Sequence, residues 1–135
     1  YKRQLEYSLK YIKKILKKLS EDPVTSKTPT IVFARDPKCN LNEFKLDGLS
    51  CYGMFTSVDP ISAIRIFEGS HALQGNLDPK ILLEEDSVIK ESALKMLSEF
   101  KDFPGYIFNL GHGITPDINP DKVKVLVEAI RESGT

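Results

Sequence analysis

Hydrophobic positions recur with two different periods along this 135-residue chain. The first twenty residues place an apolar side chain at every third or fourth position and lysines on the opposite side, which predicts an amphipathic helix. The apolar positions are Leu5, Leu9, Ile12, Ile15, Leu16 and Leu19. A basic amphipathic helix can bind a membrane or a calmodulin-like partner, but the commoner case, expected here, is an outer helix that packs its leucines on a sheet.

Four short β-prone runs follow, and each leads to an Asp-Pro or Asn-Pro pair. The runs are TIVFA at 30–34, CYGMF at 51–55, HALQ at 71–74 and YIF at 106–108, and the pairs are Asp36-Pro37, Asp59-Pro60, Asp78-Pro79 and Asn119-Pro120. An Asp or Asn side chain accepts a hydrogen bond from a free N–H at a helix start, and proline has no N–H to leave unpaired. Each pair therefore predicts the start of a helix.

Helical spacing of apolar residues supports three of these starts. It covers Ile61 to Phe67, Val88 to Phe100 after the intervening segment 80–85, and Val123 to Ile130. After Asp36-Pro37 the pattern is weaker, and Leu41, Phe44 and Leu46 indicate only a short helix. Four strand-then-helix units imply parallel strands joined by right-handed crossovers, hence an α/β fold.

Two architectures fit this order of elements. A doubly wound sheet of four or five strands would be complete at this length, whereas a (β/α)₈ barrel needs about 250 residues, so the chain would form its C-terminal half. The opening helix has no strand before it, which favours the half barrel, with residues 1–135 as a single partial domain.

Charge and composition exclude several classes of partner. Lys plus Arg equals Asp plus Glu at 19 each, so no nucleic-acid partner is expected. No apolar run is long enough for a transmembrane helix, so no membrane partner is expected either. Because the chain opens on Tyr1 rather than Met, an upstream or targeting segment is not excluded. Cys39 and Cys51 fit neither a zinc knuckle nor a CxxC motif and are expected to be reduced and incidental.

Ligands of both architectures bind at the carboxyl ends of the strands. The polar residues expected along that rim are Arg35, Asp36, Thr56, Ser57, Gln74, Asn76, Asn109 and His112. His71, at the amino end of its strand, falls on the opposite side and is interpreted as structural.

The segment Gly111-His112-Gly113 is the strongest candidate binding element. Glycines allow positive φ and a close approach of the backbone to a ligand, and an imidazole between them can form a hydrogen bond near neutral pH. Successive backbone N–H groups there can form an anion-binding concavity, which indicates a carboxylate or phosphate ligand. The alternative is a tight turn with an exposed histidine. The motif is neither a Walker sequence nor a GxGxxG fingerprint.

Other catalytic constellations lack support. Neither GxSxG nor HExxH occurs. Asp36 can be interpreted as a general acid or base, or as a helix cap. The triplet Glu84-Glu85-Asp86 precedes a predicted helix and complements its positive end, which favours a structural role over metal binding.

Two motifs in register resemble the C-terminal region of uroporphyrinogen decarboxylases. ALQGNLDP at 72–79 matches the family's LQGN(L/M)DP segment, and YIFNLGHGITPDINPDKVKVLVEAI at 106–130 contains its NLGHG loop after an interval of about thirty residues. Upstream, IVFARD is similar to the family's FAKD. The segment before Asp59-Pro60 departs from the family's GLDWT and reads GLSCYGMFTS, with Ser50 or an inserted residue where the aspartate would stand and no tryptophan.

The resemblance implies a (β/α)₈ barrel enzyme of heme and porphyrin biosynthesis. Such a lyase removes CO₂ from four acetate groups of the tetrapyrrole uroporphyrinogen III, giving coproporphyrinogen III without a metal or organic cofactor. It implies that His112 binds a substrate carboxylate, with Gly111, Gly113, Asn109 and Gln74 as neighbours.

The family's arginine-rich motif, aspartate, tyrosine and serine contacts would lie upstream of Tyr1. The chain by itself is therefore expected to hold no certain catalytic residue and to be inactive. The resemblance also implies a homodimer for the full-length protein, in the cytoplasm or in a plastid. The alternatives are a non-catalytic half-barrel module that binds a tetrapyrrole or another anion, and a cobalamin-linked methyltransferase of the same superfamily, which would need a zinc site of His and Cys ligands.

Overall fold

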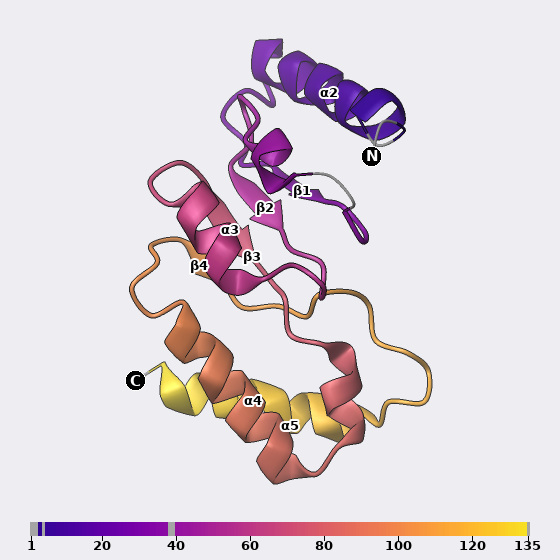
Figure 1. The fold of residues 1–135 in the computed structure, drawn as a ribbon, viewed down its shortest axis with the longest axis vertical. Coiled ribbons are helices and arrows are strands. Elements are labelled where there is room, and N and C mark those ends of the chain that lie inside the picture. Colours follow the sequence, from indigo (N-terminus) through magenta and orange to yellow (C-terminus); the bar gives the residue numbers. More distant parts are fainter. Residues whose placement is uncertain (1–2, 4, 38–39, 135) are drawn as a thin grey trace.

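Four parallel strands form one sheet in chain order, as the computed structural model in Figure 1 shows. The structure describes residues 3, 5–37 and 40–134. The strands are β1 (Ile31–Phe33), β2 (Cys51–Gly53), β3 (Ala72–Gln74) and β4 (Tyr106–Ile107). Every neighbouring pair is parallel, with helical segments between strands, so the predicted α/β fold is confirmed.

Helical segments precede, separate and follow these strands. They are the π-helical turn Leu5–Leu9, α2 (Lys10–Glu21), the 3₁₀ turn η2 (Leu41–Phe44), α3 (Pro60–Phe67), the 3₁₀ turn η3 (Pro79–Leu83), α4 (Asp86–Glu99) and α5 (Pro120–Ser133). The side chains of Asp59, Asp78 and Asn119 accept backbone N–H groups at the starts of α3, η3 and α5. Three of the four predicted Asp-Pro or Asn-Pro starts are therefore confirmed.

The fourth predicted start, Asp36-Pro37, is wrong. Asp36 has a φ of 44°, in the left-handed region, whereas residues that cap helices take an extended conformation. The chain turns there, and the Asp36 carboxylate accepts the hydroxyl of Ser57 at 3.5 Å. The short helix expected nearby begins later, after Asn40, whose side chain accepts the N–H of Asn42.

Helix α2 packs only part of its predicted apolar face. Leu9, just before the helix, and Leu16 are buried, but Ile15 is 56% exposed. Tyr1, Lys2 and Gln4 of the predicted segment lie outside the described residues. Among the helices that the structure describes, none is both long and apolar enough to cross a membrane.

One side chain from each strand faces the helices. The strand register aligns Val32, Tyr52, Leu73 and Tyr106 in a row across the sheet. The Tyr52 ring packs between Phe44, at a centroid distance of 4.9 Å, and Phe67, at 5.1 Å. At the other end of the row, Tyr106 stacks on Phe100 of the α4 C-terminus at 3.9 Å. The row thus anchors the helices to one face of the sheet.

The core has two parts. The larger one joins the row to α2, η2 and α3, and the smaller one lies between η3, α4 and α5. Helices α4 and α5 lie side by side in Figure 1, at the opposite end of the molecule from α2.

The opposite face of the sheet is largely uncovered at its edges. Ile31 and Phe33 in β1 are 50% and 49% exposed, and Ile107 in β4 is 42% exposed. These positions alternate with the row that faces the helices, so they point to the other side of the sheet. One covered face and one open face is the arrangement that half of a barrel has before the remaining strands close it.

The cap of α5 gives a direct test of the helix-start assignment. Replacing Asn119 by Ala removes the hydrogen bond that its Oδ1 accepts from Asp121 N–H at 3.0 Å. We expect the free energy of unfolding in urea to fall by about 1 kcal/mol, the usual cost of losing an N-cap. Asn119→Asp keeps the acceptor and should cost far less. Equal stability of the Ala and wild-type proteins would contradict the assignment.

Candidate functional site

The loops after β2, β3 and β4 meet at the carboxyl edge of the sheet, as predicted for the rim. Leu77 N–H donates to Asn109 O at 3.2 Å, and Gly111 N–H donates to Leu77 O at 2.8 Å. These two bonds continue the pairing of β3 with β4 beyond both strands. The segment Gly111–Gly113, named the GHG loop here, is therefore fixed by the sheet at its first residue.

Gly111 lies directly on the loop that follows β2. A Cβ atom at this position would come within 2.6 Å of the Thr56 nitrogen and 2.7 Å of its Cα, which no real side chain tolerates. Neither Gly111 nor Gly113 has a positive φ, so the loop does not use the left-handed conformations that glycine allows. Gly111 serves close packing between two loops instead.

The anion-binding concavity expected here loses one of its donors. The Gly111 N–H is already bonded to Leu77 O, so it cannot also hold a ligand. Anion binding at this loop then depends on the His112 side chain and on the N–H groups that follow Gly111.

His112 is half-buried, and two contacts fix its ring. Its Nδ1 lies 2.9 Å from the carbonyl oxygen of Gly113, and its ring centroid lies 5.6 Å from that of Phe55. A carbonyl oxygen can only accept, so Nδ1 carries a proton in this contact. Nε2 is then the nitrogen left for a ligand, as an acceptor in the neutral ring and as a donor in the imidazolium.

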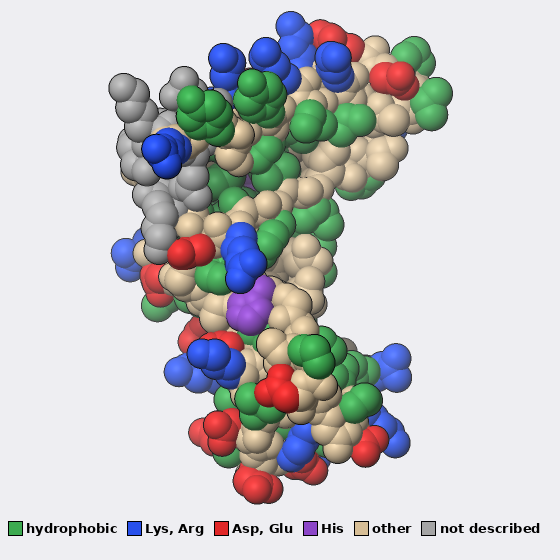
Figure 2. Space-filling view, turned by 90° about the vertical axis from the view of Figure 1, so that its right-hand side faces the viewer, with side chains coloured by type: hydrophobic (Ala, Val, Ile, Leu, Met, Phe, Trp, Pro, Cys, Tyr) green, Lys and Arg blue, Asp and Glu red, His purple; other side chains and the backbone are tan. Residues whose placement is uncertain are grey.

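Figure 2 views the molecule from the side on which the loop of residues 108–119 lies in Figure 1. A histidine side chain reaches the surface near the middle of this face, and basic side chains gather at the end that carries α2.

The other predicted rim residues have different surroundings. Gln74 ends β3 and is half-buried, while Asn109 is exposed and its Oδ1 accepts the N–H of Leu110 at 2.8 Å. Arg35 and Asp36 follow β1, and Thr56 and Ser57 follow β2. The structure thus places Thr56 against Gly111, the neighbour of His112. Asn109 lies two residues before this contact, and Gln74 ends the adjacent strand.

Asn76 is the rim residue whose surroundings were least expected. It is only 4% exposed, and its Nδ2 donates to two backbone carbonyls, Phe55 O at 3.0 Å and Val58 O at 2.7 Å. Sequence reasoning placed Asn76 on the rim and gave it no role. The only available signal was its place in the LQGN motif directly after a strand.

His71 lies at the other end of β3. Its Nε2 is 3.2 Å from Leu46 O, and its ring packs on the Phe67 ring in a T-shaped arrangement at a centroid distance of 5.7 Å. Both contacts are to the protein's own core, in keeping with a structural interpretation.

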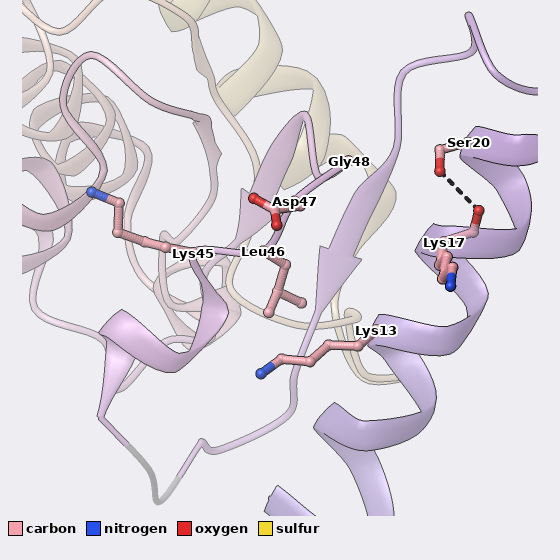
Figure 3. A pocket seen from close by; sticks show the side chains of 7 residues that line it. All are labelled: Lys13, Lys17, Ser20, Lys45, Leu46, Asp47 and Gly48. Carbon is pink, nitrogen blue, oxygen red and sulfur yellow. Dashed lines mark hydrogen bonds between the residues drawn. The ribbon is translucent and has the colours of Figure 1, made fainter.

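A basic pocket also lies away from the rim. Lys13 and Lys17 of α2 and Lys45 line a cavity of about 420 Å³, with Leu46 and Asp47 across from the helix and the Lys45 amino group turned away from it (Figure 3). The pocket lies ahead of β2, at the amino ends of the strands, so it is separate from the GHG loop.

Cysteine and metal chemistry find little support in the described part of the chain. Cys51 is buried as a free thiol, and burial raises its pKa, which lowers its reactivity. Cys39 lies outside the described residues. Across residues 3, 5–37 and 40–134, no three His, Cys, Asp or Glu side chains come close enough to hold a metal ion.

The comparison with known families identifies the family of the chain. A family model described as "Uroporphyrinogen decarboxylase (URO-D)" matches residues 3–133, nearly the whole chain. The chain belongs to the uroporphyrinogen decarboxylase family.

Curated relatives in this family come from several bacteria. The uroporphyrinogen decarboxylase of Alcanivorax borkumensis is 36% identical over 127 residues, which cover 94% of this chain and 36% of that protein. The enzyme of Chloroherpeton thalassium is 39% identical over 134 residues, covering 95% and 36%. This member of the uroporphyrinogen decarboxylase family thus spans little more than a third of the length of these relatives.

A solved structure supports the fold. A methyltransferase from Methanosarcina mazei superposes with a TM-score of 0.65 at 18% identity, over 95% of this chain and 38% of that protein. At this identity the likeness concerns the fold alone. It agrees with the predicted half barrel of four parallel strands.

The contact between Gly111 and Thr56 makes a sharp prediction for the two glycines of the loop. Gly111→Ala should lower the free energy of unfolding by about 1–3 kcal/mol, the usual cost of overpacking, because the new methyl group overlaps Thr56. The matched control is Gly113→Ala, since nothing lies within 4 Å of a Cβ there. Urea unfolding of both variants measures the difference, and equal losses would refute the contact.

The partly buried hydroxyl of Tyr106 should make the free energy of unfolding depend on pH in the alkaline range. Its hydroxyl donates to Gly75 O, and burial, followed by the charge of Glu99, raises its pKa well above the usual value. Below pH of about 10 the folded and unfolded states both keep the phenolic proton, so this contribution is fully present. At higher pH the unfolded state loses its proton first, so stability falls. Tyr106→Phe should show a flatter loss of unfolding free energy above pH of about 10. An unchanged pH profile would contradict the role of Tyr106.

Proposed function

We propose that the protein containing this chain is a uroporphyrinogen decarboxylase of heme and porphyrin biosynthesis, which converts uroporphyrinogen III to coproporphyrinogen III with loss of four CO₂. The observation that carries the proposal is the family match over residues 3–133, which includes the GHG loop. The loop's place at the carboxyl edge of a parallel sheet, where barrel enzymes bind their substrates, supports it.

His112 is proposed to bind a carboxylate of the substrate. With Nδ1 bonded to Gly113 O, the imidazolium presents Nε2–H as a charge-assisted donor. Gly111, Gly113, Asn109 and Gln74 are proposed as neighbours of the bound group. Gly111 would contribute by letting the loop rest on Thr56 rather than by donating its own N–H.

The proposed reaction requires tight binding of the substrate's carboxylates. Protonation of a pyrrole carbon creates a cation that accepts the electron pair released when an adjacent acetate loses CO₂. Such a step is favoured when the macrocycle is held in one orientation, and the tetrapyrrole's other carboxylates are the natural handles. His112 is proposed to hold one of them.

Residues 1–135 are proposed to act as one partial domain of a closed barrel. The exposed side chains Ile31, Phe33 and Ile107 mark a sheet face that further strands would cover. The remaining strands would also bring the catalytic groups that this chain does not supply, so the isolated chain is expected to be inactive. A homodimer of the full-length protein is proposed from the family resemblance alone.

The test is His112→Asn in the whole protein, with uroporphyrinogen III as substrate. We expect KM to rise about tenfold or more, since a charge-assisted hydrogen bond to the substrate contributes roughly 1.5–3 kcal/mol. The matched control is His71→Asn, which makes the same change at the opposite end of β3 and should leave KM unchanged.

Two results would overturn the proposal in different ways. If the wild-type protein binds uroporphyrinogen without releasing CO₂, the half-barrel binding module becomes the better interpretation. If the wild-type protein is active and His112→Asn has the same KM as His71→Asn, the role of His112 fails and the proposed activity stands.

A further inference from the structure

The turn formed by residues Phe55–Val58 carries the GHG loop at two points. Gly111 rests against the backbone of Thr56, and the His112 ring lies 5.6 Å from the Phe55 ring with an interplanar angle of 30°. These are the two residues that decide where the loop begins and where its imidazole lies. The position of His112 therefore depends on the position of the turn.

Asn76 holds both ends of this turn. Its amide nitrogen donates to Phe55 O at 3.0 Å and to Val58 O at 2.7 Å, while Val58 N–H closes the turn on Phe55 O at 2.9 Å. Both partners of the side chain are carbonyl oxygens, which only accept. The site therefore requires a group with two N–H donors, which Asn provides and an ionised Asp does not.

The backbone around Asn76 is itself fixed by the neighbouring strand. Gly75 N–H donates to Ile107 O at 3.1 Å, and Leu77 N–H donates to Asn109 O at 3.2 Å. Asn76 thus lies between two ladder hydrogen bonds to β4 and its extension. Because its side chain is bonded to the loop after β2, the position of Asn76 fixes the position of that loop.

We propose that Asn76 is a positioning residue for His112. It sets the orientation of the imidazole through its hydrogen bonds to the Phe55–Val58 turn, not through a bond to His112. An effect of Asn76 on catalysis rests on the proposed function of His112. Its effect on the position of the imidazole does not depend on that function. Asn76 is needed for a well-placed histidine even if the substrate of this site is another anion.

The first measurement follows the His112 ring by NMR in the whole protein with labelled histidine. Asn76→Asp places a carboxylate against two carbonyl oxygens, so the turn should release and the ring-current shift that Phe55 imposes on His112 should shrink. Asn40→Asp is the matched control, because Asn40 Oδ1 accepts the backbone N–H and the side-chain amide of Asn42, and a carboxylate accepts both equally well. If Asn76→Asp does not fold, Asn76→Ala removes the same two bonds without adding charge. A His112 signal identical to wild type in a folded Asn76 variant overturns the proposal.

The second measurement is a double-mutant cycle on uroporphyrinogen turnover. We expect the Asn76 variant to raise KM about tenfold, and to add nothing once His112 is Asn, because residues that act through one another are not additive. Independent, multiplying effects of the two changes would overturn the positioning role. If the protein shows no decarboxylase activity, the proposed function fails while the NMR result still decides the role of Asn76.

Discussion

Tyr52 and Leu73, both fully buried, occupy the centre of a row that crosses the sheet with one side chain from each strand. The rest of the structure depends on this row. Burying Leu73 alone contributes about 1.5–3 kcal/mol, and the stacked rings of Phe67 and Tyr52 add contact that only this register permits. A shift of one residue in any strand would turn that strand's member of the row toward the opposite face. The register that buries the row therefore also decides which residues end each strand, and with them the composition of the rim.

Parallel pairing has a second effect at the carboxyl edge. Since β2, β3 and β4 all run in the same direction, the loops that follow them leave the sheet at one end and compete for the same space. Gly111 and Asn76 resolve this competition in complementary ways. Gly111 has no side chain, so its loop can touch the loop after β2. Asn76 lies next to the loop after β2 and donates hydrogen bonds to two of that loop's carbonyl oxygens, Phe55 O and Val58 O. These contacts together determine the position of the histidine between Gly111 and Gly113.

Much of the fold could be predicted because its signals are local. The side chains of Asp59 and Asn119 cap helices through hydrogen bonds to residues two or three positions away, and such spacing is visible in the sequence. Asp36 has the same local sequence, but its carboxylate meets Ser57, twenty-one residues later, and no helix forms. At the rim, residue types could be predicted but contacts could not. Gly111 meets Thr56, and Asn76 meets Phe55, only after the strands have aligned. Neither contact therefore produces a local pattern in the sequence.

The two histidines of the chain show how such contacts assign a role to a residue type. His71 and His112 each place one ring nitrogen near a backbone carbonyl, Leu46 O and Gly113 O respectively, and in each case that nitrogen must carry the proton. For His71 the other nitrogen is buried beside the core, so the ring serves packing. For His112 the bonded carbonyl belongs to the next residue of its own loop, at a half-buried position on the rim, and Nε2 is left for a ligand. The ring contact with Phe55 positions the imidazole without using either nitrogen, so the carboxylate proposed for this site would meet Nε2.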